Sequence, residues 1–326
     1  MNIIETHKLR KVFRTKGNGA SQAVEAVRSI DLVVRTGEIF GFLGPNGAGK
    51  TTTLRMLSTL IPPTDGRATI AGYDLLRQSQ KVRQAIGYVS QVGGVDISAT
   101  GCENLLLQGQ LYGMSRHETE QRVAELLTML DLTSFADRIA RTYSGGQRRR
   151  LDLALGMIHR PRLLYLDEPT TGLDPQSRAR LWDEVRSLRD EGTTVFLTTH
   201  YLEEADVLAD RLAIMDHGEI VAEGTPEALK QQIAGDVITL GLDTCNGARH
   251  RAHVLLGQQS FVREIHPADG QFQLFVERGE ESLLVILRLL DDAGLSVRTV
   301  ALSRPTLDDV FLRKTGRSLR EAAESI

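Results

Sequence analysis

Residues 38–57 read EIFGFLGPNGAGKTTTLRML, and this stretch decides the fold. The apolar run from Ile39 to Leu43 predicts a buried strand, GPNGAG predicts a glycine-rich loop, and the residues from Lys50 onward predict a helix. This order is the context that the pattern GxxxxGKS/T needs before it indicates a phosphate-binding loop. Backbone amides of such a loop can point at phosphate oxygens, Lys50 can reach the β- and γ-phosphates, and the hydroxyl of Thr51 can ligate magnesium. The sequence therefore predicts a nucleotide site of the P-loop NTPase kind.

The residues expected to bind the nucleotide here form one continuous run. They are Gly44, Pro45, Asn46, Gly47, Ala48, Gly49, Lys50, Thr51 and Thr52. The alternative is a glycine-rich strand-to-helix turn that binds no nucleotide. The complete strand–loop–helix context favours the nucleotide.

A second candidate segment is LLYLDE at residues 163–168, an apolar run of strand length that ends in two carboxylates. Parallel sheets present such carboxylates at the C-terminal ends of their strands, where a metal can offset phosphate charge. Asp167 is the candidate magnesium ligand. Because neighbouring residues of a strand point to opposite faces, Glu168 can face the attacking water as the general base. An isolated pair of solvated acids is the alternative, which the phosphate loop makes less favourable.

Residues 143–150, YSGGQRRR, directly precede a stretch whose apolar residues recur at helical spacing. Two glycines at the start of a helix let backbone amides approach an anion closely, and the positive end of the helix prefers one. The basic run Arg148 to Arg150 allows a nucleic-acid interpretation, but a solvated helix face or a partner contact is the reading that we favour.

The composition sets limits on the class of protein. The chain has 326 residues, 41% of them hydrophobic and 25% charged, which is typical of a globular protein with a large domain and room for a second. A formal charge of −3 gives no global reason to expect nucleic acid as a partner. Two distant cysteines indicate neither disulfides nor a cysteine zinc site. We expect no signal peptide and no membrane-spanning helix, and a cytoplasmic location.

Taken in order, these motifs resemble the nucleotide-binding subunit of an ATP-binding cassette (ABC) transporter over about the first 230 residues. GPNGAGKTT resembles the Walker A motif, YSGGQ the signature motif and LLYLDE the Walker B motif. Gln91 in GYVSQ resembles the Q-loop, Leu173 to Pro175 the D-loop, and His200 in LTTH the H-switch.

The resemblance implies the ligands and the further site residues. ATP and Mg²⁺ are the expected cofactors, with Thr51, Gln91 and Asp167 as metal ligands. Lys50, Glu168 and His200 are the expected catalytic residues. Nucleotide contacts are also implied for Phe13, Gln91, Ser144, Gly145, Gly146, Gln147 and Asp174. Phe13 would stack on adenine; the alternative is an ordinary strand residue that packs inward.

The resemblance also implies the partners. Two copies would face each other head to tail, so that Ser144, Gly145 and Gly146 of one copy close over the ATP of the other. A separately encoded transmembrane permease would hold the dimer on the inner face of the cell membrane. Between Gln91 and Tyr143, patterns with helical periodicity resemble the helical subdomain that contacts this permease, which we place at about residues 96–155.

The last third of the chain has a different pattern. We expect the nucleotide-binding domain to cover residues 1–232 and an accessory or regulatory domain to cover 233–326. Alternating and helical stretches in the order βαββαβ predict a small α+β, ferredoxin-like unit. Its closing segment, SRPTLDDVFLRKTGR, resembles daunorubicin-resistance-type drug-exporter ATPases.

The function that we predict is ATP hydrolysis that energises an export system, with a drug, an antibiotic or another lipophilic molecule as cargo. Two alternatives stay open. One is an exporter of lipid or polysaccharide, and the other is a soluble ABC ATPase that acts on nucleic acid or ribosomes. Proteins of the latter kind usually carry two cassettes or a long coiled coil, whereas this chain has one P-loop and no sustained heptads.

Overall fold

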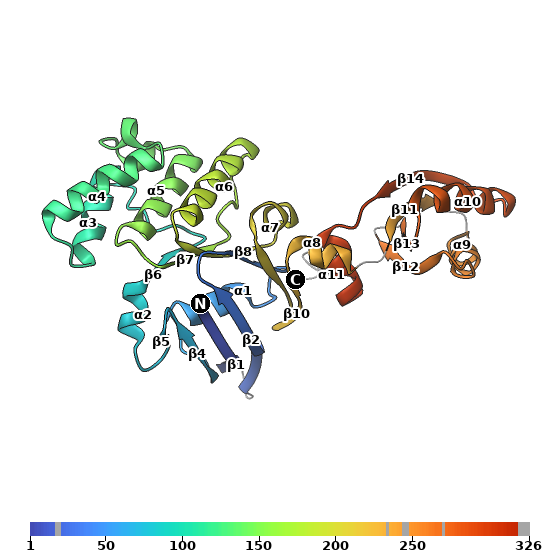
Figure 1. Ribbon diagram of the computed structural model, residues 1–326, viewed down its shortest axis with the longest axis horizontal. Helices are drawn as coiled ribbons and strands as arrows, with labels where there is room; N and C mark the ends of the chain where they lie inside the picture. Colours follow the sequence, from blue (N-terminus) through green and yellow to red (C-terminus); the bar gives the residue numbers. More distant parts are fainter. Residues whose placement is uncertain (17–20, 233–234, 243–247, 269–270, 319–326) are drawn as a thin grey trace. The chain divides into compact units, whose positions relative to one another are not determined.

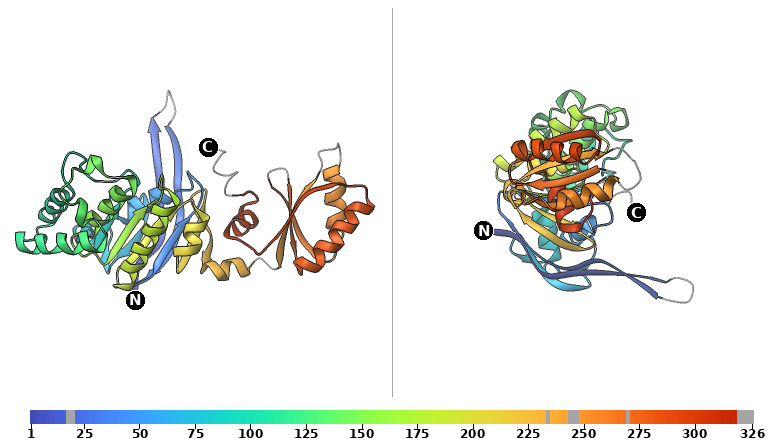
Figure 2. Two further views of the ribbon diagram at one scale, coloured as in Figure 1. Left: turned by 90° about the horizontal axis from the view of Figure 1, so that it is seen from above. Right: turned by 90° about the vertical axis from the view of Figure 1, so that its right-hand side faces the viewer.

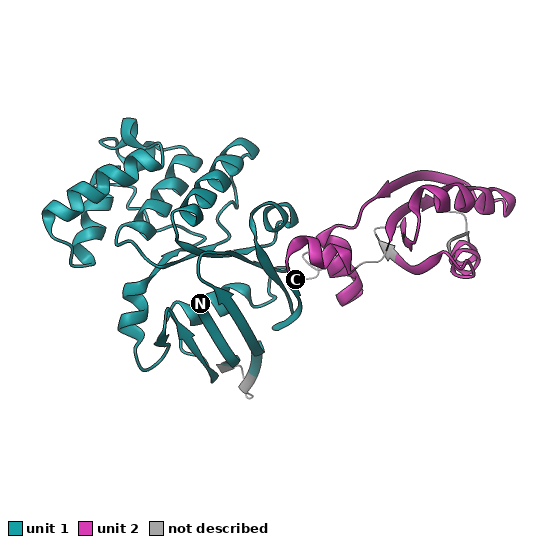
Figure 3. Ribbon diagram, in the orientation of Figure 1, with its two compact units in different colours: residues 1–223 teal, residues 224–326 magenta. Residues whose placement is uncertain are grey.

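The computed structural model describes residues 1–16, 21–232, 235–242, 248–268 and 271–318. Contacts divide the chain into two compact units, residues 1–223 and 224–326 (Figure 3). Helix α8 (Pro226–Gln231) belongs to the second unit because it packs against α11 (Leu307–Thr315). The domain boundary expected between residues 232 and 233 stays a prediction.

A six-stranded sheet forms the centre of the first unit, with the order β10-β9-β3-β8-β7-β6. Its strands are β3 (Ile39–Leu43), β6 (Ile86–Val89), β7 (Leu163–Asp167), β8 (Thr194–Thr199), β9 (Arg211–Asp216) and β10 (Glu219–Gly224). Strands β9, β3, β8, β7 and β6 are parallel to one another. All residues of β3, β7 and β8 are buried, as expected of parallel strands covered on both faces. Their C-terminal ends share one edge, where the site residues gather.

An antiparallel sheet of β2 (Ser21–Arg35), β1 (Asn2–Lys16), β4 (Asp65–Ile70) and β5 (Tyr73–Asp74) belongs to the same unit. The sequence RTKGNGASQA at residues 14–23 predicts a loop, and that prediction is wrong at both ends. Arg14 pairs with Ala23, and Lys16 pairs with Ser21, as the two strands continue into a long hairpin (Figure 2). Strand pairing satisfies the backbone N–H and C=O groups whatever the side chains are, so a polar stretch can still form a strand. Residues 17–20 of the predicted loop lie outside the described residues.

Helices cover the central sheet on both faces (Figure 1). Helix α1 (Lys50–Leu57) packs with the antiparallel sheet into one core, and α2 (Ser79–Ala85) adds Val82 to it. Against the other face lie α6 (Pro175–Asp190) and the helical subdomain, which contains α3 (Gly101–Leu111), α4 (Arg116–Met129) and α5 (Gly145–Met157). Helix α7 (Leu202–Leu208) follows β8. Thr100, Ser115 and Ser144 each begin a helix with a capping box, which fixes where α3, α4 and α5 start.

The second unit has the predicted order βαββαβ. Its elements are β11 (Asp236–Leu242), α9 (Ala248–Gly257), β12 (Val262–Ala268), β13 (Gln271–Val276), α10 (Gly279–Asp292) and β14 (Val297–Ser303), followed by α11. The strands form an antiparallel sheet in the order β12-β13-β11-β14, and α9 and α10 pack on it around a core of aliphatic side chains and Phe272. The α/β P-loop core and the α+β ferredoxin-like unit are therefore both confirmed.

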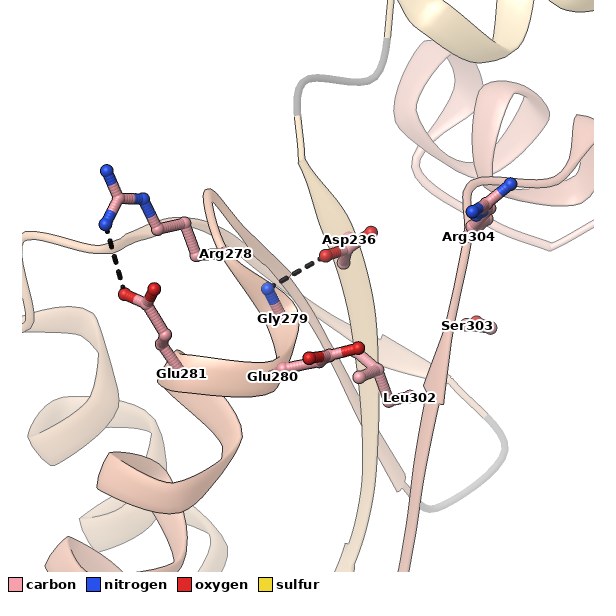
Figure 4. Close-up of a pocket in the computed structure, with 8 residues that line it drawn as sticks. All are labelled: Asp236, Arg278, Gly279, Glu280, Glu281, Leu302, Ser303 and Arg304. Carbon is pink, nitrogen blue, oxygen red and sulfur yellow. Dashed lines mark hydrogen bonds and ion pairs between the residues drawn. The ribbon is translucent and has the colours of Figure 1, made fainter.

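A pocket of about 400 Å³ lies beside the start of α10 in this unit (Figure 4). Asp236 Oδ2 accepts a hydrogen bond from the amide of Gly279 at 2.8 Å, and Arg278 pairs with Glu281 at 3.2 Å. The polar side chains that line this pocket are three carboxylates, two guanidinium groups and one hydroxyl, from Asp236, Glu280, Glu281, Arg278, Arg304 and Ser303.

Candidate nucleotide-binding site

The loop between β3 and α1 leaves no room for side chains at two of its glycines. A Cβ atom at Gly44 would lie 2.2 Å from the carbonyl oxygen of Met215. Gly49 has a φ of +107°, and a Cβ atom there would lie 2.4 Å from the carbonyl oxygen of Ala26. Glycine is thus required by close packing against β2 and β9, as well as by backbone conformation. This packing presents the N-terminus of α1 to the pocket as an anion site.

Lys50 is held inside this loop. Its Nζ donates hydrogen bonds to the carbonyl oxygens of Gly44 at 2.7 Å and Pro45 at 3.0 Å. The same atom lies 3.6 Å from Glu168 Oε1. Burial lowers the pKa of Lys50, and the nearby carboxylates of Glu168 and Asp167 oppose that shift. The result is a buried, preoriented cation at the place where phosphate charge would need one.

Asp167, the last residue of β7, receives hydrogen bonds from two threonines. The hydroxyl of Thr51 lies 3.0 Å from Asp167 Oδ1, and the hydroxyl of Thr198 lies 2.7 Å from it. Thr51 and Asp167 thus present two hard oxygen atoms side by side, a donor set that suits Mg²⁺. Thr198 was not predicted; the sequence shows it only as a polar residue near the end of β8.

Glu168 is the point on which the other polar groups converge. Its Oε2 accepts hydrogen bonds from Gln91 Nε2 at 3.1 Å and from the Thr171 hydroxyl at 3.3 Å, and His200 Nδ1 lies 3.1 Å away. Burial alone would raise the pKa of Glu168, but His200 and Lys50 outweigh burial and the pKa is lowered. Glu168 is therefore a carboxylate, the form that a general base requires.

The backbone of Glu168 is strained. Its φ is +46°, in the left-handed region that a residue with a Cβ atom rarely adopts. The amide of Glu168 is held by the carbonyl oxygen and the hydroxyl of Thr198, both at 3.1 Å. Such conformations persist only where surrounding contacts fix them, and they cluster at functional sites.

These groups border a pocket of about 580 Å³. The predicted residues that line it are Asn46, Gly47, Gly49, Lys50, Thr51, Thr52, Gln91, Glu168 and His200. Ala26 and Thr171 also line it and were not predicted. Thr171 could have been suspected from its place just after the two carboxylates, whereas Ala26 has no signal in the sequence.

Other predicted residues lie elsewhere. Ala48 is buried in the core, and its carbonyl oxygen accepts a hydrogen bond from Gly218. Phe13 on β1 does not line the pocket; its side chain is 41% exposed, and Lys11 Nζ lies 5.2 Å from its ring centroid. Its ring is thus available at the surface rather than packed inward, so the inward-packing alternative is wrong.

The signature residues are separate from this pocket. Ser144 caps α5, its hydroxyl accepting from the amide of Gln147, while Gln147 Oε1 accepts from the amide of Ser144. Ser144, Gly146 and Gln147 line a different hollow of about 140 Å³, which shares no residue with the nucleotide pocket. A Cβ atom at Gly145 would meet only Leu173, at 3.9 Å.

Asp174 also lies outside the nucleotide pocket. It caps α6, accepting hydrogen bonds from the amide of Ser177 at 2.9 Å and from its hydroxyl at 2.7 Å. The predicted residues at the starts of these two helices are Ser144, Gly145, Gly146, Gln147 and Asp174. None of these residues lines the P-loop pocket of the same chain.

The basic run at the start of α5 differs from the prediction. Arg149 is only 8% exposed and donates to three backbone carbonyl oxygens, those of Ser90, Asp167 and Pro169. Arg150 donates to the carbonyl oxygens of Leu130 and Asp131. The solvated-face interpretation is therefore wrong for both. Their register on α5 turns them inward, toward carbonyl oxygens that the strand and helix ends leave without donors.

Two family models match the chain. Residues 27–171 match the ABC transporter model, and residues 224–315 match the C-terminal domain of DrrA1-3-like ATP-binding proteins. The daunorubicin/doxorubicin resistance ATP-binding protein DrrA of Streptomyces peucetius is 44% identical, over 98% of this chain and 96% of that protein. The linearmycin resistance ATP-binding protein LnrL of Bacillus subtilis is 36% identical, over 90% and 95%.

Solved structures agree with these relatives. A dimeric ATP-binding cassette in a post-hydrolysis state, bound to ADP and Pi, matches with a TM-score of 0.61 and 27% identity. The match covers 68% of this chain and 98% of that one. An ATP-binding subunit of an ABC transporter matches with a TM-score of 0.60 and 27% identity, over 71% and 92%.

Proposed function

Because the chain belongs to the ATP-binding cassette transporter family, we propose that it binds and hydrolyses ATP to energise an export system with a separate transmembrane permease. The observation that carries this proposal is the convergence of Lys50, Gln91 and His200 on Glu168 beside the glycine-rich loop. A buried cation can offset phosphate charge, and a carboxylate base and an imidazole can activate and orient the attacking water, so this set suits phosphoryl transfer to water.

Each of these residues has a chemical task in the proposal. The loop amides and Lys50 bind the phosphates, and Lys50 offsets negative charge as the β–γ bond breaks. Glu168 accepts a proton from the attacking water, which His200 helps to orient. Thr51 and Asp167 would hold Mg²⁺, with Gln91 as a further candidate ligand; the ion would supply a charge that neutralises the phosphate oxygens.

The signature residues act on a second copy of the chain in this proposal. A capped helix start with Gly145 open to the surroundings suits a close approach to an anion. Since its hollow is separate from the P-loop pocket, the anion must belong to another molecule. We assign it to the γ-phosphate of ATP bound by the partner copy, with Ser144, Gly146 and Gln147 around it and Asp174 nearby. ATP binding then favours a closed head-to-tail dimer, and hydrolysis releases it.

A mixture of two inactive variants tests this arrangement. Gly145→Asp places a negative charge against the partner's phosphate but leaves its own P-loop intact. Lys50→Ala removes the cation of its own P-loop but leaves its signature residues intact. Each variant by itself should be inactive. A heterodimer regains one complete site, from the P-loop of the first chain and the signature of the second. Hydrolysis that reappears only on mixing supports the head-to-tail dimer. Its absence, with both variants folded and Gly145→Asp still binding ATP, would contradict it.

The cargo that we propose is supported by the names of the relatives. DrrA and LnrL are named as drug-resistance proteins, so we propose a lipophilic drug or antibiotic. The Nod factor export ATP-binding protein I of Sinorhizobium fredii is 38% identical over 90% of this chain, so we keep a lipid or polysaccharide as the second candidate cargo. Vesicles that contain the chain and its permease should accumulate a labelled lipophilic drug when ATP is present. Uptake of a lipid or glycan substrate instead would move the cargo to that class.

Membrane association is also proposed to depend on the permease. No helix within the described ranges has both the length and the apolar character needed to cross a bilayer. We place the chain on the cytoplasmic face of the cell membrane, bound to the permease through its helical subdomain. Copurification with an apolar membrane protein supports this placement. Copurification with DNA or ribosomes would favour the nucleic-acid alternative, which the names of these three relatives do not support.

A further inference from the structure

Helix α5 contacts the catalytic residues of its own chain as well as presenting the signature residues. We propose that Arg149, assisted by Asp152, is a positioning residue for Glu168 and Gln91 of its own chain. The helix would then serve two nucleotides: its first residues contact the partner's ATP, and its second turn shapes the site on the chain's own ATP. This inference rests on the proposed head-to-tail dimer.

The contacts of Arg149 surround the general base. Its guanidinium donates to the carbonyl oxygen of Asp167 at 3.2 Å and to that of Pro169 at 2.7 Å. These two residues flank Glu168 in the sequence. Because the φ of Glu168 is +46°, the peptide groups around it need fixed partners to hold the strained conformation. Arg149 supplies one donor to the peptide group between Asp167 and Glu168 and another to the peptide group that follows Pro169.

The same guanidinium reaches the Q-loop. Its Nη1 donates to the carbonyl oxygen of Ser90 at 2.6 Å, directly before Gln91. Three acceptors from two separate segments match the planar fork of an arginine, which a lysine ammonium cannot reproduce. All three lie against a side chain that is only 8% exposed. Shortening it would leave buried carbonyl oxygens without donors.

Asp152 holds the other end of the Q-loop. Its Oδ1 accepts from the amides of Gly94 at 2.6 Å and Val95 at 3.2 Å. Gly93 has a φ of +87°, and a Cβ atom there would lie 2.7 Å from Asp152 Oδ2, so the loop passes close against the carboxylate. Gln91 thus lies between two anchors on one helix, one turn apart.

The test places Arg149→Lys in either member of the mixed dimer described above. The chain with Gly145→Asp supplies both the P-loop and Glu168 of the single working site. Arg149→Lys in that chain should lower turnover by about 10- to 100-fold, the scale expected when a catalytic group is displaced by about 1 Å. In the Lys50→Ala chain, which supplies only the signature, turnover should stay within about twofold. Equal losses in both positions, or a loss in the second alone, would overturn the proposal.

A second measurement does not depend on the dimer. Arg149→Lys alone should bind ATP with an affinity within about twofold of the parent chain, because the P-loop is untouched. In the crystal structure of this variant, either the backbone of Glu168 should no longer have a left-handed φ, or the hydrogen bond from Gln91 to Glu168 should be lost. An unchanged Glu168 and Gln91 would refute the positioning role. If the mixed dimer of parent variants regains no activity, the head-to-tail proposal fails, while this structural result still decides the role of Arg149.

Matched variants separate positioning from loss of stability. Arg122 on α4 is also buried and donates to an α5 carbonyl oxygen, that of Met157, at 3.1 Å. Arg122→Lys should lower the melting temperature while turnover changes by less than about twofold. Asp152→Asn keeps the shape of the side chain but removes the charge that strengthens its bonds, so a smaller loss of about 3- to 10-fold is expected, again only in the chain that supplies Glu168. A greater effect of Arg122→Lys on turnover would contradict the proposal.

Discussion

Glu168 combines three properties that a base for water activation needs: ionisation, hydrogen-bonding partners and a fixed backbone. Lys50 and His200 keep its pKa low, while Gln91 and Thr171 orient its Oε2. Replacing the carboxylate by an amide of the same shape removes the proton acceptor alone. We predict that Glu168→Gln retains ATP binding while turnover falls by about 10²- to 10⁴-fold.

Steady-state hydrolysis and an equilibrium ATP titration of the same preparation check this prediction. Glu203→Gln, at an exposed glutamate of α7, is the control and should leave both measurements unchanged. Hydrolysis at the parent rate in Glu168→Gln would assign the base to another group.

Glu184 on α6 gives the chain a titration near neutral pH. Burial raises its pKa to about 7, which Arg150 opposes with its Nε atom 3.8 Å from Glu184 Oε1. The folded state therefore binds the proton more tightly than the unfolded state does. The stabilisation that results is complete below pH 4.5, the ordinary pKa of a glutamate, and is lost as the pH rises through about 7.

The measurement is the free energy of unfolding by urea as a function of pH. The parent chain should lose stability relative to Glu184→Gln between pH 4.5 and about 7, and the difference should be constant below that interval. Glu120→Gln on the exposed face of α4 serves as the control. Parallel curves for the parent and Glu184→Gln would show that the pKa of Glu184 is not raised.

The motifs of the sequence predict those site residues whose own side chains lie near the phosphates. Lys50, Gln91, Glu168 and His200 are expected together from motif order, and the structure brings them to one pocket. Arg149 could not be predicted in this way. Its role depends on carbonyl oxygens that become neighbours only when β6, β7 and α5 pack, and no local pattern encodes that meeting.

At the scale of elements, the phosphate loop depends on neighbours as much as on its glycines. A side chain at Gly49 would combine a φ of +107° with a contact of 2.4 Å to the backbone of β2. Gly49→Ala should therefore displace the loop and destabilise the chain by about 1–3 kcal/mol, the range for a strained backbone. ATP affinity should fall with it.

Gly72→Ala is the matched comparison. Gly72 has a φ of +87°, but a Cβ atom there would lie within 4 Å of no residue other than its neighbours in the chain. Gly72→Ala has the cost of a positive φ but no steric clash. Its ATP affinity should therefore match that of the parent chain in calorimetric titration. A similar loss of affinity in both variants would show that the contact with β2 is not what shapes the loop.

The prediction of secondary structure is wrong where pairing with another strand determines the backbone conformation. The strand–loop–helix order around Lys50 is confirmed because apolar periodicity and glycine spacing are local signals. The loop predicted at residues 14–23 is wrong at both ends because cross-strand hydrogen bonds, which composition does not show, continue β1 and β2 through Arg14 and Lys16.

For the whole molecule, the main expectation is that ATP joins two copies. Gly145→Asp fits sterically, since a Cβ atom there would meet only Leu173, at 3.9 Å, so the monomer should fold and bind ATP normally. The added charge opposes the partner's γ-phosphate. We predict that sedimentation shows ATP-dependent dimers for the parent chain and monomers for Gly145→Asp. Normal dimerisation of this variant would refute the head-to-tail arrangement.

Strand order also sets when the phosphate loop can form during synthesis. Strand β3 lies between β8 and β9, so the strands that flank it, Thr194–Thr199 and Arg211–Asp216, follow it far along the chain. A ribosome that adds about 5–20 residues per second needs on the order of 10–30 s to make them after β3. Strands β1, β2 and β4 can pair long before that time. The nascent chain thus carries the ATP-binding sequence well before it has an ATP site, and nucleotide can assist its folding only once about two-thirds of the 326 residues have been translated.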